Sequence, residues 1–267
     1  MGTALITGAS AGIGLEFAWQ LAAARHDLVL VARNEKKLNT IAEQIRSVTG
    51  VNVEVLPADL TKKSDLKKVA KRLSHTTVTF GPDSEVNPEL QPHAPIGLLI
   101  NNAGFSSGQT LLDGNLDDEL DQLDVMVRAV LVLSRAAAKQ MVKRGRGAIC
   151  NVGSIAALTA GGTYAAAKSW VRTFTEALSV ELAGTGVTAT VVAPGLTRTE
   201  FHDRAELDMS AMPEFAWLEP SQVVDEALAD VRRGTVHSIP SKRYKVAAAG
   251  LRMAPRSAVR AMGRRGV

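Results

Sequence analysis

The chain has 267 residues, with 31 Lys or Arg, 27 Asp or Glu and a formal net charge of +4. Hydrophobic residues make up 46% and aromatic residues 4%, which is typical of a globular protein and argues against an aromatic-rich nucleic-acid binder. No apolar stretch reaches the roughly 18 residues of a spanning helix, and the first residues show no secretory pattern, so we expect a cytoplasmic protein.

Short apolar runs alternate with segments of helical periodicity along most of the chain. We predict strands at residues 3–8, 27–32, 51–57, 96–101, 147–152 and 187–193. We predict helices at residues 13–25, 35–49, 62–73, 116–143, 164–184 and 220–233. Apolar strands that alternate with helices indicate a parallel sheet covered on both faces. The expected fold class is therefore α/β, a single doubly wound sheet of the Rossmann type. The one cysteine, Cys150, is expected to be a buried strand residue in a reducing compartment.

Two segments depart from this alternation. Residues 75–95 contain four prolines and little periodicity, so we expect an inserted surface loop there. Residues 232–267 carry ten Lys or Arg and no acidic residue, so the net +4 of the whole chain leaves −6 for residues 1–231. We divide the chain into a main domain, residues 1–235, and a basic C-terminal extension, residues 236–267.

A glycine-rich turn, Thr7-Gly8-Ala9-Ser10-Ala11-Gly12-Ile13-Gly14, joins the first predicted strand to the first predicted helix. Glycines there allow a tight turn and a close approach of the backbone to a pyrophosphate. The start of the helix supplies unpaired N–H groups and the positive end of its dipole. The spacing G-x-x-x-G-x-G differs from the commonest dinucleotide fingerprint. Its place between strand and helix nevertheless favours a dinucleotide site.

The residues that follow the second predicted strand bear on the choice of cofactor. An acidic residue there would hold the ribose 2′-hydroxyl of NAD, whereas an arginine accommodates a 2′-phosphate. This chain has Ala32 followed by Arg33 and Asn34. Arg33 can pair with a phosphate and no carboxylate repels one, so we predict NADP(H) over NAD(H). The alternative is that Arg33 is a solvated loop charge.

Tyr164 and Lys168 are four residues apart in a predicted helix and should share one face. A nearby ammonium favours the phenolate and should lower the pKa of the tyrosine. Such a tyrosine could exchange a proton with an alcohol or an alkoxide as a general acid or base. Taken alone, the pair is also compatible with an ordinary amphipathic helix.

Together these features resemble the short-chain dehydrogenase/reductase family over about residues 1–235. The motifs that carry the resemblance are Thr7 to Gly14, Asp59, Asn101-Asn102-Ala103-Gly104, Ser154, Tyr164 with Lys168, and Pro194-Gly195 with Thr197 and Thr199. The resemblance implies that the main domain is an NADP-binding catalytic domain. It also implies an oxidoreductase that interconverts a carbonyl and an alcohol.

The resemblance implies a role for each matching position. Phosphate contacts fall to Gly8, Ser10, Gly12, Ile13 and Gly14. The adenine would be flanked by Asp59 and Leu60, and the ribose and pyrophosphate bordered by Asn102, Ala103 and Gly104. After Pro194-Gly195, the residues Leu196, Thr197 and Thr199 would hold the nicotinamide carboxamide. Ser154 would hydrogen-bond the substrate oxygen, and Lys168 would also bind the nicotinamide ribose.

Two departures from the family pattern stand out. Met126 occupies the position of an asparagine that in the family helps to hold a proton-relay water, and a thioether is only a weak acceptor. The segment between Ser154 and Tyr164 is also shorter than usual, which would either widen the substrate cleft or displace Ser154. These departures leave open an alternative function, a catalytically weakened protein that binds NADP(H) as a ligand or sensor.

Signals for substrate and partners are weaker. The loop after Thr199 carries apolar side chains at Phe201, Met209, Met212, Phe215, Trp217 and Leu218. They favour a lipophilic carbonyl or alcohol, or else they pack the loop onto the sheet. The basic extension would contact an anionic membrane surface or pack on its own domain, with Pro255 interrupting any single long helix. The helices at 116–143 and 164–184 form a dimer contact in many relatives, so we expect a homodimer or homotetramer. We expect no metal and no nucleic acid.

Overall fold

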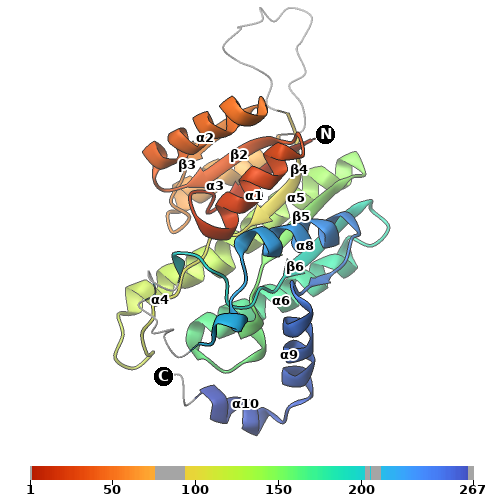
Figure 1. Ribbon diagram of the computed structural model, residues 1–267. Helices are drawn as coiled ribbons and strands as arrows, with labels where there is room; N and C mark the ends of the chain where they lie inside the picture. The colour runs from red at the N-terminus through yellow and green to blue at the C-terminus, as the bar shows by residue number, and fades with distance from the viewer. Residues whose placement is uncertain (1, 76–93, 202–204, 206–211, 264–267) are drawn as a thin grey trace, which may run out of the picture.

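Seven parallel strands form one sheet in the computed structural model, which describes residues 2–75, 94–201, 205 and 212–263. The strand order is β3-β2-β1-β4-β5-β6-β7, so the chain reverses direction across the sheet between β1 and β4 (Figure 1). The strands are β1 (Thr3–Thr7), β2 (Asp27–Ala32), β3 (Val53–Pro57), β4 (Ile96–Asn101), β5 (Gly147–Val152), β6 (Val187–Val192) and β7 (His237–Ser238). The α/β fold class predicted from the sequence is confirmed.

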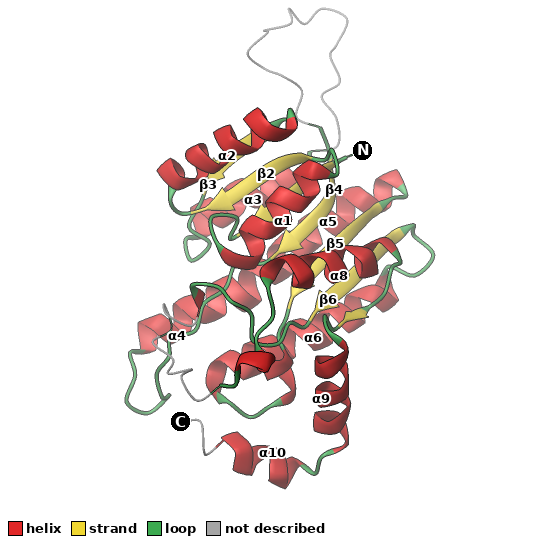
Figure 2. Cartoon of the chain, in the orientation of Figure 1, coloured by secondary structure: helices red, strands yellow, loops and turns green. Residues whose placement is uncertain are grey.

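Helices cover both faces of the sheet (Figure 2). One face packs against α1 (Gly12–Ala23), α2 (Glu35–Thr49) and α8 (Pro220–Arg232). The other packs against α3 (Lys63–Ser74), α5 (Ala129–Arg144) and α6 (Gly162–Glu181). The core is therefore two apolar layers with the sheet between them. All five residues of β1 are buried, as expected for a central strand enclosed on both sides.

Local sequence signals explain where several helices begin and end. The side chain of Asn34 accepts a hydrogen bond from the backbone N–H of Lys37 and caps the start of α2. Gly50 ends the same helix with a φ of 72°, a left-handed conformation that glycine adopts without a steric penalty. Pro220 is the first residue of α8, where its missing N–H costs no hydrogen bond.

The long helix predicted at 116–143 is interrupted. It consists of α4 (Leu116–Leu123), a π-helical turn η1 (Asp124–Arg128) and α5, and Met126 lies in the π-helical turn. Such turns are often found at functional sites. The sheet also contains a strand that we did not predict, β7. It lies just beyond residue 235, where we placed the end of the main domain.

The remaining predicted elements match to within about three residues at each end, and three strands match at both ends. The extension folds into α9 (Lys242–Met253) and α10 (Arg256–Gly263), and the break between them falls at Pro255 as expected. Two short 3₁₀ turns, η2 (Ile155–Leu158) and η3 (Glu214–Ala216), lie in the loops that follow β5 and β6. Most of the predicted insertion, residues 76–93, lies outside the described residues.

Candidate active site

The glycine turn between β1 and α1 is shaped by backbone conformations that favour glycine. Gly8 has a φ of +67° and Gly12 a φ of +53°, both in the left-handed region. Gly14 is required for a different reason, because a Cβ atom there would lie 2.3 Å from the carbonyl oxygen of Gly8. The turn therefore folds back on itself. Its glycines carry no side chains that would cover the start of α1.

The neighbouring strand β4 fixes the position of this turn. The Asn102 side-chain amide donates to the carbonyl oxygens of Thr7 and Gly8 at 3.0 and 3.3 Å. In return, the Thr7 hydroxyl accepts from the backbone N–H groups of Asn102 and Ala103, both at 3.0 Å. These four hydrogen bonds join the carboxyl ends of β1 and β4, where the strand order reverses and where ligands of such sheets bind.

The start of α1 has the properties of a phosphate site. Its N-cap residue, Ala11, offers no side chain to the first N–H groups, and the first turn contains no acidic residue. Those N–H groups and the positive end of the helix dipole are therefore available to an anion. Ser10 and Ile13 are partly exposed at the same turn. These residues fit the pyrophosphate of a dinucleotide.

The adenosine end predicted from the sequence lies at the carboxyl ends of β2 and β3. Arg33 and Asn34 are exposed directly after β2, and Asn34 uses its side chain to cap α2. After β3, the Asp59 carboxylate accepts from the backbone N–H and the hydroxyl of Thr61 at 3.1 and 2.8 Å. Leu60 is buried beside it. Arg33 thus keeps an exposed guanidinium on this edge, whereas Asp59 and Asn34 already have structural partners.

The three predicted catalytic residues lie together. Ser154 follows β5 directly, and Tyr164 and Lys168 lie in the first two turns of α6. The Ser154 side chain lies close enough to the Tyr164 phenol to act on its pKa. The Lys168 ammonium donates to the carbonyl oxygen of Val152 at 2.8 Å and lies 5.6 Å from the centre of the Tyr164 ring.

The pKa of Tyr164 is shifted in the opposite direction from the one predicted from the sequence. Burial raises the pKa of Tyr164 to about 12, and the hydrogen bond from Ser154 only partly opposes that rise. Burial also lowers the pKa of Lys168 to about 8. The predicted lowering of the Tyr164 pKa is therefore wrong for the protein alone, because loss of solvation on burial raises the pKa instead.

Met126 stands beside these groups. Its side chain is 1% exposed, and its sulfur would lie 3.2 Å from a Cβ atom placed on Gly104. The Lys168 Nζ would lie 3.6 Å from the same Cβ atom, so the thioether and the ammonium flank one glycine. The π-helical turn brings Met126 to this place even though the usual asparagine is absent.

The segment after β6 forms the opposite wall of the site. A Cβ atom on Gly12 would lie 3.0 Å from the Cγ2 atom of Thr199, which places this segment against the glycine turn. The Thr197 hydroxyl donates to the carbonyl oxygen of Gly195 at 3.0 Å, and Pro194 and Leu196 flank it in sequence. The predicted nicotinamide segment and the predicted phosphate turn therefore meet.

The apolar loop residues divide between the two roles that we considered. The ring of Phe201 lies 5.5 Å from the ring of Tyr164, so it forms part of the catalytic surroundings. Leu218 is 1% exposed and packs the loop onto the protein, whereas Phe215 is 72% exposed. Met209 lies outside the described residues.

Sequence reasoning missed two side chains that hold this site. Thr7 was quoted only as part of the glycine turn, although a hydroxyl at the end of a buried strand was the available signal. Tyr244, in α9, hydrogen-bonds the backbone of Leu196 and Ala216. Nothing in its sequence neighbourhood indicates a contact 48 residues away.

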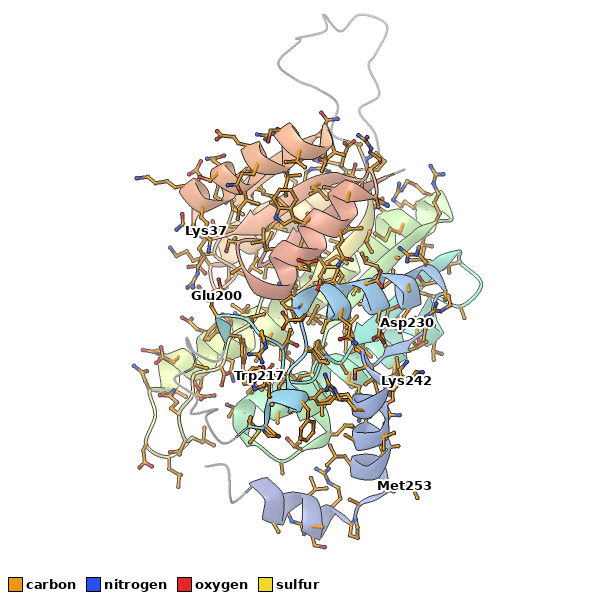
Figure 3. The ribbon with its side chains drawn as sticks, in the orientation of Figure 1. Lys37, Glu200, Trp217, Asp230, Lys242 and Met253 are labelled. Carbon is orange, nitrogen blue, oxygen red and sulfur yellow. The ribbon has the colours of Figure 1, made fainter. Side chains whose placement is uncertain are left out.

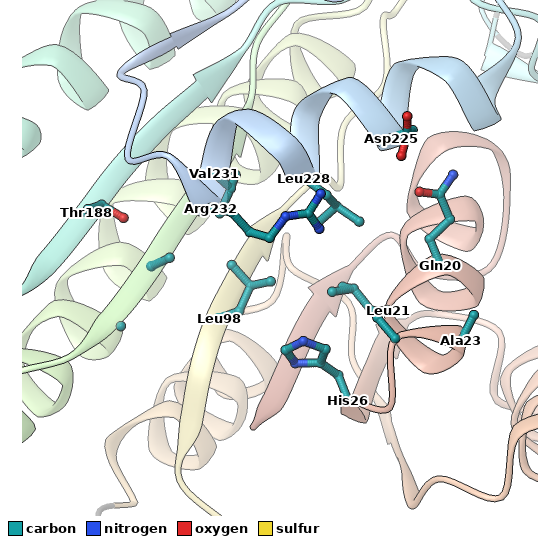
Figure 4. Close-up of a pocket in the computed structure, with 13 residues that line it drawn as sticks. Gln20, Leu21, Ala23, His26, Leu98, Thr188, Asp225, Leu228, Val231 and Arg232 are labelled. Atoms are coloured by element: carbon teal, nitrogen blue, oxygen red, sulfur yellow. The ribbon is translucent and has the colours of Figure 1, made fainter. Parts of the chain in front are cut away.

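A cavity of about 570 Å³ lies elsewhere, between α1 and α8 (Figure 4). It is lined by residues such as His26, Leu98 and Thr188, which lie near the amino ends of the strands. Ligands of doubly wound sheets bind at the carboxyl ends. We therefore assign the active site to the edge that carries Tyr164 and not to this cavity.

A doubly wound sheet with a glycine turn after β1 and a group of Ser154, Tyr164 and Lys168 after β5 is typical of nicotinamide-dependent oxidoreductases. The family model described as short chain dehydrogenase matches residues 2–210. The chain belongs to the short-chain dehydrogenase/reductase family.

Individual relatives agree with this assignment. A curated relative from Schizosaccharomyces pombe, the NADP-dependent 3-hydroxy acid dehydrogenase, is 34% identical over 74% of this chain and 73% of its own. A short-chain dehydrogenase from Sphingobium yanoikuyae, solved in complex with NADPH, is 34% identical, with a TM-score of 0.82 over 94% of this chain and 92% of its own. The bulky-bulky ketone specific alcohol dehydrogenase from Comamonas testosteroni is 29% identical, with a TM-score of 0.76 over 97% and 96%.

Proposed function

We propose that this oxidoreductase uses NADP(H) to interconvert a carbonyl and an alcohol on a lipophilic substrate, with Tyr164 as the general acid or base. The observation that carries the proposal is the grouping of Ser154, Tyr164 and the buried Lys168, whose ammonium lies 5.6 Å from the centre of the Tyr164 ring, on the edge of the sheet that bears the glycine turn. Family membership supports the reaction type.

The roles follow from the positions of the side chains. The bound nicotinamide would supply or accept the hydride, and the protein has to place the substrate and move one proton. Tyr164 keeps its proton at neutral pH because its pKa is about 12, so it is ready to protonate a developing alkoxide. Ser154 would hydrogen-bond the same oxygen. Lys168, charged below pH about 8, would hold the nicotinamide ribose.

Three observations support NADP(H) as the cofactor. Arg33 is exposed directly after β2, and the sequence places no carboxylate at Ala32, Arg33 or Asn34. A guanidinium pairs well with a phosphate. The relative from Schizosaccharomyces pombe is named NADP-dependent, and the one from Sphingobium yanoikuyae was solved with NADPH.

The proposal of a lipophilic substrate rests on Phe201 and on one relative. The Phe201 ring lies against Tyr164, so a substrate that approaches the phenol meets an aromatic surface. The Comamonas testosteroni relative is described as specific for bulky-bulky ketones. A ketone with apolar groups on both sides of the carbonyl is the substrate class that we favour.

A binding or sensor protein on the same fold is the second candidate. The observation that favours it is Met126, whose buried thioether lies near Lys168 where the family has an asparagine. A thioether donates no hydrogen bond and accepts only weakly, so it cannot replace the amide in a proton relay.

Consumption of NADPH with a panel of lipophilic ketones and aldehydes separates the two candidates. The proposal predicts turnover of at least one bulky ketone, with NADPH strongly preferred to NADH. Saturable NADPH binding without turnover of any member of a broad panel would favour the sensor instead. The role of Met126 can then be tested separately. Met126→Asn should raise turnover if the missing amide limits the proton relay.

We also infer that the protein forms homodimers through α4, α5 and α6. Exposed leucines follow one another along the first two of these helices, at Leu116, Leu120, Leu123 and Leu131, with exposures of 42 to 66%. Exposed apolar side chains that group on one surface often mark a protein interface. Light scattering should give twice the chain mass of 28.3 kDa, or four times for a tetramer, and the mass should fall to one chain in Leu120→Arg.

The contacts of the basic extension favour packing on its own domain over a membrane role. Ala248 and Val259 are each 1% exposed, and Arg256 hydrogen-bonds the carbonyl oxygen of Leu158. Met253, at the far end of α9, is 87% exposed (Figure 3). No helix among the described residues is long and apolar enough to cross a membrane. Liposome flotation that depends on residues 242–267 would restore the membrane alternative.

A further inference from the structure

The loop between β6 and α8 returns to the place where it starts. Thr197 and Leu218 form a parallel bridge between its two ends. The backbone N–H of Leu218 donates to the carbonyl oxygen of Leu196 at 2.8 Å, and that of Arg198 donates to the carbonyl oxygen of Leu218 at 3.0 Å. The two ends of the loop are thus held side by side. The outgoing end includes residues 194–199, the segment proposed to contact the nicotinamide, which we call the nicotinamide wall.

The side chain of Tyr244 joins both ends at this point. Its hydroxyl accepts from the backbone N–H of Leu196 at 3.0 Å and donates to the carbonyl oxygen of Ala216 at 2.7 Å. One hydroxyl therefore satisfies a donor on the outgoing end and an acceptor on the returning end. Both hydrogen bonds are partly buried, so the hydroxyl links the two ends at the edge of the solvent.

The ring of Tyr244 explains a glycine that backbone conformation does not. A Cβ atom on Gly195 would lie only 2.0 to 2.3 Å from the nearest ring carbons of Tyr244. The φ angle of Gly195 lies outside the left-handed region, so its backbone conformation alone is compatible with other residues. Gly195 is needed because the tyrosine ring packs directly on the backbone of the nicotinamide segment.

The start of α9 is itself anchored near the catalytic serine. Tyr244 and Leu251 pack against the cluster of Leu158, Ile239 and Ala248, and Leu158 belongs to the turn that follows Ser154. Next to Tyr244, Arg243 donates to the carbonyl oxygen of Trp217 at 3.0 Å. Trp217 and Lys242, the first residue of α9, are labelled in Figure 3. The extension therefore contacts the segments on both sides of the proposed substrate site.

We propose that Tyr244 is a positioning residue through which the C-terminal extension sets the nicotinamide wall. The inference rests on the proposed function, because it requires residues 196–199 to contact the nicotinamide half of NADP(H). Tyr244 does not touch the reacting atoms. It acts through the backbone of Leu196, whose position determines where Thr197 and Thr199 meet the cofactor.

Tyr244→Phe tests this inference because it keeps the ring on Gly195 and removes both hydrogen bonds. Calorimetric titration with two ligands gives the readout. NADPH carries the nicotinamide, whereas adenosine 2′,5′-bisphosphate carries only the half that Arg33 would bind. We expect the Kd for NADPH to rise about tenfold, corresponding to roughly 1.4 kcal/mol, and the Kd for the bisphosphate to stay unchanged. Val246→Ala, at an exposed position on the same helix, should change neither Kd.

The possible failures are distinguishable. Equal weakening of both ligands by Tyr244→Phe would show a general structural role and overturn the inference, as would equal affinity of the variant and the unaltered protein for NADPH. If the unaltered protein binds neither ligand, the proposed function itself fails and this inference with it. Gly195→Ala gives a second test, because its Cβ atom should displace the ring and weaken NADPH binding with the same selectivity.

Discussion

The two walls of the cofactor site are held in different ways. The phosphate wall, between β1 and α1, depends on glycine conformations and on hydrogen bonds from the adjacent strand β4. The nicotinamide wall, after β6, is held by a side chain of the C-terminal extension, 48 residues further along the chain. The first wall is held from the adjacent strand β4, and the second depends on a helix beyond residues 2–210, the part of the chain that the family model matches.

This difference suggests how the family can vary its chemistry on one scaffold. On the proposed function, the phosphate wall would recognise a part of the cofactor that stays the same for every substrate, so it can be rigid. The nicotinamide wall continues into the loop that carries Phe201, close to Tyr164. A tertiary contact such as that of Tyr244 lets the extension tune this wall without disturbing the phosphate site.

Breaking the phosphate wall should have the largest effect. In Gly14→Ala the new Cβ atom would lie 2.3 Å from the carbonyl oxygen of Gly8, so the turn has to move. We expect a loss of about 1–3 kcal/mol in the free energy of unfolding and at least a roughly tenfold loss of NADPH affinity. Chemical denaturation and calorimetric titration measure the two effects.

Gly97→Ala is the matched control for this change. A Cβ atom at Gly97 has its nearest neighbour at 3.9 Å, which is ordinary contact, and the residue lies in β4, away from the glycine turn. Unaltered NADPH binding in Gly14→Ala would contradict our account of the phosphate wall.

A smaller and more selective effect is expected at the adenosine end of the same wall. Arg33→Ala removes the exposed guanidinium after β2 and should weaken NADPH by about tenfold, since hydrogen bonds to charged groups contribute ~1.5–3 kcal/mol. NADH, which has no 2′-phosphate, should bind as before. Arg146→Ala, an exposed arginine at the start of β5, serves as control. Equal losses for both cofactors would remove the argument for NADP(H).

The pH dependence of stability and of NADPH affinity tests the role of Lys168. Its pKa is lowered from 10.5 to about 8, so the folded protein loses this proton at lower pH than the unfolded chain does. Between pH 8 and 10.5 the unfolded state binds more protons, and this group makes stability rise with pH in that window. The cation itself is lost above about pH 8, so NADPH affinity should decline there.

Lys168→Arg separates charge from other causes of that decline. An arginine stays charged throughout this range, so the variant should show a flat affinity profile even if its turnover is low. A decline of the same size in Lys168→Arg would assign the pH dependence to another group.

Much of the fold could be predicted because its signals are local. The strand at Ile96–Asn101 is a short apolar run and was predicted at both ends. The strand β7 has only two residues, too few for any periodic pattern, and it forms only because β6 offers an edge. The π-helical turn at Met126 was also missed, because the helical periodicity continues through it.

In the candidate site, too, features with local sequence signals were predicted and features that depend on tertiary contacts were not. The sequence predicts that Ser154, Tyr164 and Lys168 are grouped, and the structure brings them together. The pKa of Tyr164 was predicted in the wrong direction because a sequence reveals charged neighbours but not the loss of solvent. Tyr244 could not be found because its contact depends on how α9 docks.

We propose that Tyr164 transfers the proton while the surrounding walls hold NADP(H). Turnover and NADPH affinity should therefore be measured together in Tyr164→Phe, with a bulky ketone that the unaltered protein reduces. We predict that turnover is lost while the Kd for NADPH changes by less than about threefold, or ~0.7 kcal/mol. Retained ketone reduction in Tyr164→Phe would contradict the account.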